Sequence, residues 1–226
     1  MRYSSALPAT FLSRPNRFVA QVLLDGRETT VHVKNTGRCR ELLVPGAAVW
    51  LEKSKNPARK TLYDLITVQK GTRLINMDSA APNAIFREWA QTSGHFGKPL
   101  LIKPEQRFGD SRLDFYLETA SRRIFVEVKG CTLEENGVCR FPDAPTERGV
   151  KHLKELIRCK EAGYDACIAI IIQMEQADHF EPNDKTHPAF GRALREANAA
   201  GVEILALSCR VSPMEIAARG FVPVVL

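Results

Sequence analysis

The chain has 226 residues, of which 44% are hydrophobic and 26% are charged. This length suits one large domain or two small ones, and it is enough to bury a core. The near-average composition excludes a disordered, collagen-like or coiled-coil chain. The longest unbroken apolar run, residues 166–172, is far shorter than the roughly 20 residues of a membrane span. The N-terminal segment lacks the pattern of a secretory signal, so we expect no membrane partner.

The six cysteines form no recognisable metal or redox motif. No two of them have Cys-x-x-Cys spacing, which argues against a zinc ribbon. A chain of this length needs no disulfides to fold. The sequence therefore predicts reduced cysteines and a cytoplasmic location.

Positive charge is concentrated in the first third of the chain. Residues 1–82 hold 13 Lys and Arg against 6 Asp and Glu, whereas residues 83–226 hold 19 against 20. A basic front and a neutral back indicate two units, the first suited to a polyanion such as nucleic acid. A basic surface that serves only solubility is the alternative.

Short β-rich runs separated by turn signals fill the front of the chain. Asp25-Gly26, Pro45-Gly46 and Lys70-Gly71 mark three of the turns. The expected strands are residues 17–24, 28–33, 47–52, 62–69 and 73–77. This pattern predicts a small OB-like β-barrel, a fold whose face binds oligonucleotides. An SH3-like barrel would give nearly the same pattern.

The rest of the chain alternates helices and strands. We expect helices at residues 82–91, 146–162 and 188–200, a loop over 92–104, and strands at 112–118, 123–129, 138–141, 166–173 and 202–208. The order α-β-β-β-α-β-α-β predicts a mixed sheet covered by helices, an α/β domain. We therefore divide the chain into an N-terminal domain, residues 1–80, and a C-terminal domain, residues 81–226.

Two neighbouring predicted strands carry the most specific chemistry. Folding them as a hairpin places Asp114 directly opposite Glu127, with the Cβ atoms roughly 5 Å apart. Carboxylates this close repel unless a divalent cation lies between them, and oxygen ligands favour Mg²⁺ or Mn²⁺. The carbonyl of Val128 would be a third ligand, and Lys129 would orient water or neutralise charge on a phosphorane. A polar strand face, on which Lys129 simply pairs with a carboxylate, is the alternative.

The segment that leads into the second predicted helix is a candidate phosphate site. Asp143 and Thr146 are suitable N-cap residues, and Arg148 and His152, four residues apart, share one helix face. Basic residues beside a helix N-terminus favour phosphate binding. An ordinary cap followed by a solvated face would explain the same residues.

Six front-domain residues are candidates to follow a phosphate backbone, with Arg38 the leading one. They are Arg38, Lys34, Arg40, Asn35, Arg59 and Lys60. Phe18, Trp50 or Tyr63 would offer a surface on which bases stack. A plain turn at residues 35–37, and a barrel core that contains the aromatic side chains, are the alternatives.

Several motifs give the chain a family resemblance. In chain order they are Arg14-Pro-Asn-Arg-Phe18, His32-Val-Lys-Asn-Thr-Gly-Arg38, Ser111-Arg-Leu-Asp-Phe115, Glu127-Val-Lys-Gly130 and Phe141-Pro-Asp143. The strand pair resembles the core of PD-(D/E)XK nucleases. The whole chain resembles the sugar fermentation stimulation protein A family of bacteria and archaea.

This resemblance implies an OB-like barrel joined to a PD-(D/E)XK nuclease-like domain, DNA binding, and a link to maltose and other sugar catabolism. It places Asp114, Glu127 and Lys129 at the nuclease positions. A further carboxylate is expected in this family, for which Glu105 is the first candidate metal ligand and Glu88 a competing one.

The resemblance also implies that a second group of residues flanks the same pocket. This group consists of Asp143, Arg148 and His152, and Asp143 is counted among the expected nucleic-acid contacts.

Two functions from different classes follow. The first is a nuclease that depends on Mg²⁺ or Mn²⁺ and acts on DNA or RNA. The second is a non-cleaving, DNA-binding regulator of sugar-use genes that keeps the nuclease fold, because fold and intact ligands do not prove activity. No obligate protein partner is evident in the sequence.

Overall fold

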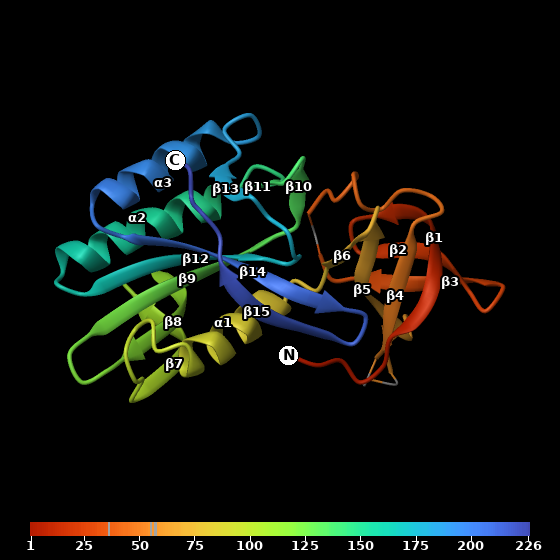
Figure 1. The fold of residues 1–226 in the computed structure, drawn as a ribbon, viewed down its shortest axis with the longest axis horizontal. Coiled ribbons are helices and arrows are strands. Elements are labelled where there is room, and N and C mark those ends of the chain that lie inside the picture. The colour runs from red at the N-terminus through yellow and green to blue at the C-terminus, as the bar shows by residue number, and fades with distance from the viewer. Residues whose placement is uncertain (36, 55, 57) are drawn as a thin grey trace.

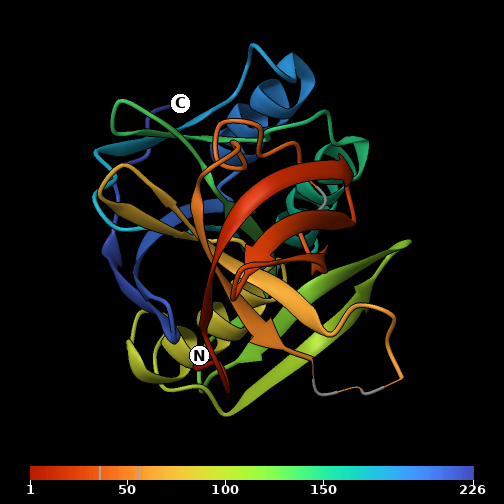
Figure 2. The same cartoon turned by 90° about the vertical axis from the view of Figure 1, so that its right-hand side faces the viewer.

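The structure is a computed structural model that describes residues 1–35, 37–54, 56 and 58–226. A β-barrel lies on one side of the molecule and a helix-covered sheet lies on the other (Figure 1). Figure 2 looks onto the barrel, with the second sheet and its helices behind it. The barrel core and the core beneath two of the helices join in one hydrophobic cluster, so the two units share buried surface.

The barrel is built from the first part of the chain. Its strands are β1 (Leu7–Asn16), β2 (Val19–Leu24), β3 (Arg27–Val33), β4 (Ala48–Lys53), β5 (Tyr63–Lys70) and β6 (Arg73–Asn76). The sheet order is β3-β2-β1-β4-β5-β6, and a parallel pairing of β3 with β5 closes five strands into a ring. Alternate residues of β2 (Ala20, Val22 and Leu24) point into the core, as a half-buried strand requires. The predicted OB-like barrel is confirmed.

The prediction missed strand β1, although it lies at the centre of the barrel sheet. It contains Pro8 and Pro15, which cannot donate to a strand ladder, and only Phe11 is fully buried. Neither composition nor alternation therefore marks it in the sequence. Its partners on both sides, β2 and β4, fix it in place instead.

The second unit is a mixed sheet between helices. Its elements are α1 (Ala81–Thr92), β7 (Leu101–Phe108), β8 (Ser111–Glu118), β9 (Arg123–Cys131), β10 (Leu133–Glu135), β11 (Val138–Phe141), α2 (Glu147–Glu161), β12 (Asp165–Ile172), β13 (His179–Pro182), α3 (Pro188–Ala199), β14 (Glu203–Ser212) and β15 (Glu215–Phe221). The main sheet has the order β15-β14-β12-β9-β8-β7, in which β9, β12 and β14 run parallel. Helices α2 and α3 cover one face and α1 the other (Figure 1). The predicted mixed-sheet α/β fold is confirmed.

Four strands of this unit were not predicted. The expected loop over residues 92–104 ends too late, because β7 begins at Leu101 and forms an exposed edge strand. The others are β15, the opposite edge, and β10 and β13, which form a small sheet with β11. Strand β7 has no buried residue, and β10 and β13 have only three and four residues, too few to give a recognisable alternation. In the described ranges, no helix is long and apolar enough to cross a membrane.

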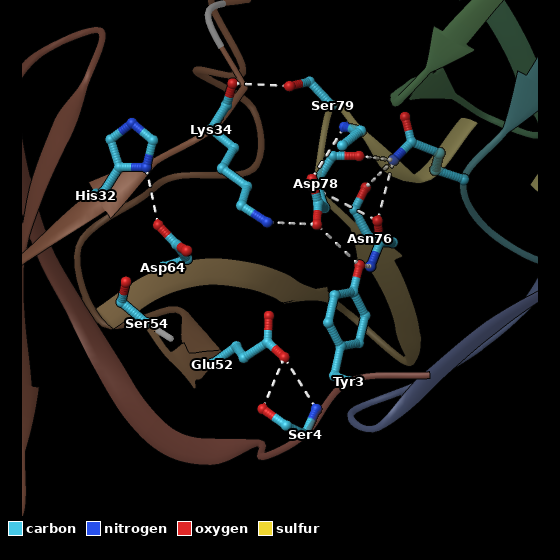
Figure 3. Close-up of polar contacts among 12 residues, drawn as sticks. Tyr3, Ser4, His32, Lys34, Glu52, Ser54, Asp64, Asn76, Asp78 and Ser79 are labelled. Carbon is cyan, nitrogen blue, oxygen red and sulfur yellow. Dashed lines mark hydrogen bonds and ion pairs between the residues drawn. The ribbon is translucent and has the colours of Figure 1, made fainter. Parts of the chain in front are cut away.

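Polar contacts gather where the barrel meets the C-terminal unit. Lys34 Nζ donates to Asp78 Oδ2 at 2.7 Å, and Asn76 Nδ2 donates to the hydroxyl of Tyr3 at 2.8 Å (Figure 3). Tyr3 lies before the barrel begins, and its amide donates to the carbonyl of Met214 at the β14–β15 turn. The first residues of the chain therefore contact the C-terminal unit. The division at residues 80 and 81 stays a prediction.

All six cysteines are buried and free of disulfides. Burial raises the pKa of the Cys39 and Cys159 thiols to about 12. Thiols with such high pKa values are almost entirely protonated near neutral pH, and only the thiolate is a strong nucleophile. These cysteines are packing residues.

Candidate metal and nucleic-acid site

The hairpin of β8 and β9 brings two carboxylates together. Phe115 pairs with Val126, so the antiparallel register sets Asp114 opposite Glu127, as the sequence predicts. The regular ladder stops at this point. Beyond it, the amide of Val128 donates to Asp114 Oδ2 at 2.8 Å. Val128 thus touches the site through its N–H, and the role of its carbonyl as a ligand stays a prediction.

Glu127 lies at the centre of a buried polar network. Only 2% of its side chain is exposed. Its Oε1 accepts from Lys129 Nζ and from His152 Nδ1. On the other side of the imidazole, Arg148 Nε donates to His152 Nε2 at 3.4 Å. Since Nε2 is the acceptor, Nδ1 carries the proton that is donated to Glu127.

The second oxygen of Glu127 has no partner among the described residues. Its Oε2 is buried and makes no hydrogen bond to any of them. A buried carboxylate oxygen is costly to leave unpaired. Burial alone would raise the pKa of Glu127, but the hydrogen bond from His152 and the positive charge of Lys129 outweigh burial and lower it. Glu127 is therefore kept ionised, with one oxygen free to bind a cation.

Asp114 has a different electrostatic environment. Burial, and next the negative charge of Glu127, raise its pKa. The repulsion expected between these two carboxylates is therefore present, and a cation bound beside them would relieve it. A side chain from the opposite face of the sheet also reaches Asp114, because Asn83 Nδ2 of α1 donates to Asp114 Oδ1 at 3.2 Å. No local pattern in the sequence marks this contact between residues far apart in the chain.

The start of α2 positions the basic residues. Thr146 is the N-cap, and its hydroxyl accepts from the amide of Gly149 at 3.1 Å. A Cβ at Gly149 would approach Thr146 Cγ2 to 2.9 Å and the Phe190 ring to 3.2 Å, which explains a glycine in the first helical turn. Four residues apart, Arg148 and His152 lie on one helix face, as predicted. The Arg148 side chain is exposed and His152 is buried beside Glu127.

The structure does not bring a third carboxylate into this group. Glu105 is 66% exposed, and its nearest charged partner is Arg112 at 3.5 Å. Glu88 is 57% exposed and pairs with the amino group of Met1. Among the described residues, no three His, Cys, Asp or Glu side chains are grouped to hold a metal ion. Neither Glu105 nor Glu88 therefore joins Asp114 and Glu127.

The barrel loop that follows β3 contacts the segment before α2. The backbone amide of Arg38 donates to Asp143 Oδ2 at 2.9 Å. Asn35 Oδ1 accepts from the amide of Gly37, and the guanidinium of Arg14 donates to the carbonyls of Asn35, Gly37 and Arg38. Asn35, Arg38 and Asp143 are therefore brought together, and the Arg38 side chain is left exposed.

Two of the predicted phosphate contacts are already paired with carboxylates. Lys34 pairs with the buried Asp78, and Arg59 forms two hydrogen bonds to Asp64. His32 Nδ1 also lies 2.9 Å from Asp64, and these partners lower the pKa of Asp64 against the opposing effect of burial. Arg40 and Lys60, like Arg38, remain exposed. A role in phosphate binding fits the exposed side chains better than Lys34 or Arg59.

Comparison with known proteins covers nearly the whole chain. The family model described as the SfsA N-terminal OB domain matches residues 12–77. The model described as the sugar fermentation stimulation protein RE domain matches residues 80–215. The chain belongs to the SfsA family. The family resemblance inferred from the sequence motifs is confirmed.

Relatives in the SfsA family match end to end. The sugar fermentation stimulation protein homolog of Desulfitobacterium hafniense strain DSM 10664 / DCB-2 is 58% identical over 226 residues, which cover 100% of this chain and 99% of the relative. The homolog of Clostridium beijerinckii is 52% identical over 100% of both chains. The solved structure of Pyrococcus furiosus SfsA in complex with Ca²⁺ has a TM-score of 0.91 at 33% identity, over 100% of this chain and 98% of that one.

Proposed function

We propose that this protein is a nuclease that uses a divalent cation to hydrolyse phosphodiester bonds in nucleic acid. The observation that carries the proposal is the buried, ionised Glu127 with its unpaired Oε2, set opposite Asp114. A carboxylate pair of this kind is unfavourable by itself and becomes favourable when it binds a cation. The solved relative that contains Ca²⁺ supports a divalent ion in this family.

The oxygen atoms available as metal ligands at this site suit a hard cation. Asp114 and Glu127 would hold it through carboxylate oxygens, with the carbonyl of Val128 as the predicted third ligand, and oxygen ligands favour Mg²⁺ or Mn²⁺. When bound, such an ion polarises a phosphoryl oxygen and lowers the pKa of water.

The side chains around Glu127 have distinct roles in this proposal. Lys129 Nζ, held at Glu127 Oε1, supplies positive charge where the pentavalent phosphorus would gather negative charge. His152 is a positioning residue, because its Nδ1–H fixes the orientation of the Glu127 carboxylate. Arg148 is exposed beside them at the N-terminus of α2, where it would bind the phosphate.

The barrel would hold the nucleic acid. The excess of positive charge lies in the first 82 residues, and the Arg38, Arg40 and Lys60 side chains are exposed there. Lysine and arginine contacts to phosphates make binding weaken steeply with salt. Binding by this protein should therefore fall as the salt concentration rises.

A non-cleaving, DNA-binding regulator of sugar-use genes is the second candidate function. The observation in its favour is that the described residues offer two carboxylates rather than three or more at the site. This candidate predicts the same salt-sensitive binding with no turnover.

A cleavage assay distinguishes the two functions. Single-stranded DNA, duplex DNA and RNA are each incubated with the protein in Mg²⁺, Mn²⁺ or EDTA. The proposal expects cutting that requires metal and is abolished by Asp114→Asn or Glu127→Gln. Glu105→Gln is the matched control and should cut normally, because Glu105 lies outside the carboxylate pair. Salt-sensitive binding without any cutting would instead support the regulator.

A further inference from the structure

A cavity of about 390 Å³ lies at the junction between the barrel and the C-terminal unit. Arg17, Asn35 and Gly37 line it from the barrel side. The opposite wall consists of residues 130–133, at the end of β9, and residues 140–146, which lead into α2. Lys129 of the candidate metal site comes directly before the first of these segments, and Arg148 comes two residues after the second. The cavity is therefore close along the chain to the site where a phosphodiester would be cut.

The polar groups of this cavity suit a nucleobase better than a phosphate. The Asp143 carboxylate forms part of the wall and would repel a phosphate, whereas it can accept a hydrogen bond from a base N–H. Arg140, the cation of the opposite wall, is already paired with Glu135 at 2.9 Å and with Glu181. Its charge is largely neutralised, so the C-terminal wall offers no free cation for an anion.

An exposed aromatic ring lies beside the cavity. Arg17 lines the cavity, and its guanidinium is 4.8 Å from the centroid of the Phe18 ring. Phe18 is 47% exposed, whereas Trp50 and Tyr63, the other two aromatic candidates, pack against the hydrophobic clusters. An exposed aromatic ring is a common platform on which a base of a single strand stacks.

The volume of the cavity suits a small group such as one base. Its volume is at the low end of the range for small-ligand sites, roughly 300–1,000 Å³. Its two walls touch, because the Arg38 amide donates to Asp143 Oδ2 at 2.9 Å. A Cβ at Gly37 would come within 2.2 Å of the same oxygen, so the loop is pressed against Asp143. Because these two walls are held together, we expect an unpaired base to enter more readily than a base pair.

We propose that the junction cavity binds an unpaired nucleobase, with a neighbouring base stacked on Phe18, and that the substrate is therefore single-stranded nucleic acid. This inference rests on the proposed nuclease function and specifies its substrate class. The base in the cavity would anchor the strand, and the adjoining phosphate would lie toward Lys129 and Arg148.

The test measures binding by fluorescence anisotropy in EDTA, so that no cutting occurs. The probes are a labelled single strand of roughly ten nucleotides, the same strand in a duplex, and a strand of equal length with abasic residues. We expect the single strand to bind about tenfold more tightly than the duplex or the abasic strand. Phe18→Ala should weaken single-strand binding about tenfold, and Asp143→Asn several-fold, because the amide replaces one acceptor oxygen by a donor.

Two controls separate a base contact from a general loss of structure. Phe221 is an exposed phenylalanine of the C-terminal unit, so Phe221→Ala should bind the single strand normally. Phe18→Ala should bind the abasic strand as the unaltered protein does, because no base is left to stack. A variant that unfolds would instead lose binding to all probes and show a lower melting temperature.

The outcomes also separate this inference from the proposed function. Equal binding of duplex and single strand, unchanged by Phe18→Ala, would overturn the base site while leaving metal-dependent cutting intact. Loss of cutting in Asp114→Asn together with the expected binding pattern would support both. Absence of any nucleic-acid binding or cutting would overturn both.

Discussion

Asn76 and Gln173 hold each other through hydrogen bonds in both directions. The backbone amide of Asn76 donates to the backbone carbonyl of Gln173 at 2.9 Å, and Gln173 Nε2 donates to Asn76 Oδ1 at 3.1 Å. The same Nε2 lies 3.1 Å from the carbonyls of Asn76 and Asp78. This pair joins the end of β6 in the barrel to the end of β12 in the main sheet. The polar groups at this contact are satisfied only while the two units are docked.

Replacing Gln173 by Leu should destabilise the protein by about 1–3 kcal/mol. The variant removes three hydrogen bonds from Gln173 Nε2. Asn76 Oδ1 and the Asp78 carbonyl keep the amides of Asp78 and Ala81 as donors, but the buried backbone carbonyl of Asn76 loses its donor, and an unpaired buried acceptor costs roughly that much. Urea unfolding measures the change in the free energy of unfolding. Gln91→Leu, at an exposed position of α1, is the matched control. Equal stabilities of the two variants would contradict this account of the junction.

Gly130→Ala should also destabilise the junction, for a steric reason. A Cβ at residue 130 would lie 2.4 Å from Gln173 Oε1 and 2.8 Å from Pro82 Cγ. Overpacking of this kind costs about 1–3 kcal/mol. Thermal unfolding should show a lower melting temperature than for Gly220→Ala, where a Cβ meets nothing within 4 Å. A variant as stable as the control would show that the Gln173 and Pro82 side chains move aside at little energetic cost.

Glu134 should make stability depend on acid pH. Burial opposes ionisation, but Arg73, the amide of Gly137 and Lys70 outweigh it and lower the pKa of Glu134 from 4.5 to about 2. Because the folded pKa is below the unfolded one, the stabilisation is complete above pH 4.5 and is lost as the pH falls toward 2. Its size is at most about 3 kcal/mol.

Unfolding free energies measured between pH 7 and the acid range test this dependence. Glu134→Gln should lower stability at neutral pH and flatten the curve over the acid range. Glu28→Gln, at an exposed position of β3, should leave the curve unchanged. A Glu134→Gln curve parallel to that of the unaltered protein would contradict the prediction.

His152→Ala should weaken cation binding more than nucleic-acid binding. Removal of the imidazole leaves Glu127 Oε1 with Lys129 as its remaining donor, so the carboxylate is less firmly oriented. Loss of such a supporting contact typically lowers metal affinity by about 10- to 100-fold. Calorimetric titration with Mn²⁺ measures this affinity, and anisotropy in EDTA measures binding of the single strand.

Lys151→Ala is the control for that experiment, since Lys151 is an exposed neighbour on the same helix. It should leave Mn²⁺ affinity unchanged. Unaltered Mn²⁺ binding by His152→Ala would show that His152 does not position Glu127. A conservative His152→Asn variant, which keeps a donor, should recover part of the affinity.

Local patterns in the sequence predicted those parts of the fold that local interactions determine. The apolar spacing of α2 and its Thr146 cap gave the helix to within a residue at each end, and the continuous apolar run gave β12. The sequence did not predict strands β1 and β7, for two different reasons. The first is stabilised by partners rather than by its own composition, and the second is an exposed edge.

The sequence also placed some residues of the candidate site and could not place others. Two strands joined by a short turn fix the register of Asp114 and Glu127, so counting residues along the hairpin was enough to pair them. Sequence position alone could not place Glu105, whose backbone is in the left-handed region at φ 53° and whose side chain is exposed. The contacts of Asn83 and of the Arg38 amide depend on how distant elements pack, and no local pattern encodes that.

The barrel is attached to its neighbour at both ends of its own sequence. Tyr3 hydrogen-bonds to Met214 before the barrel starts, and Asn76 bonds to Gln173 as it finishes. A domain that contacts its neighbour at both ends has to match that neighbour at both contacts. Chimaeras that combine the barrel of one family member with the sheet of another should fold only when both attachment points come from the same parent. The barrel and the main sheet are therefore expected to be interchangeable only as a matched pair.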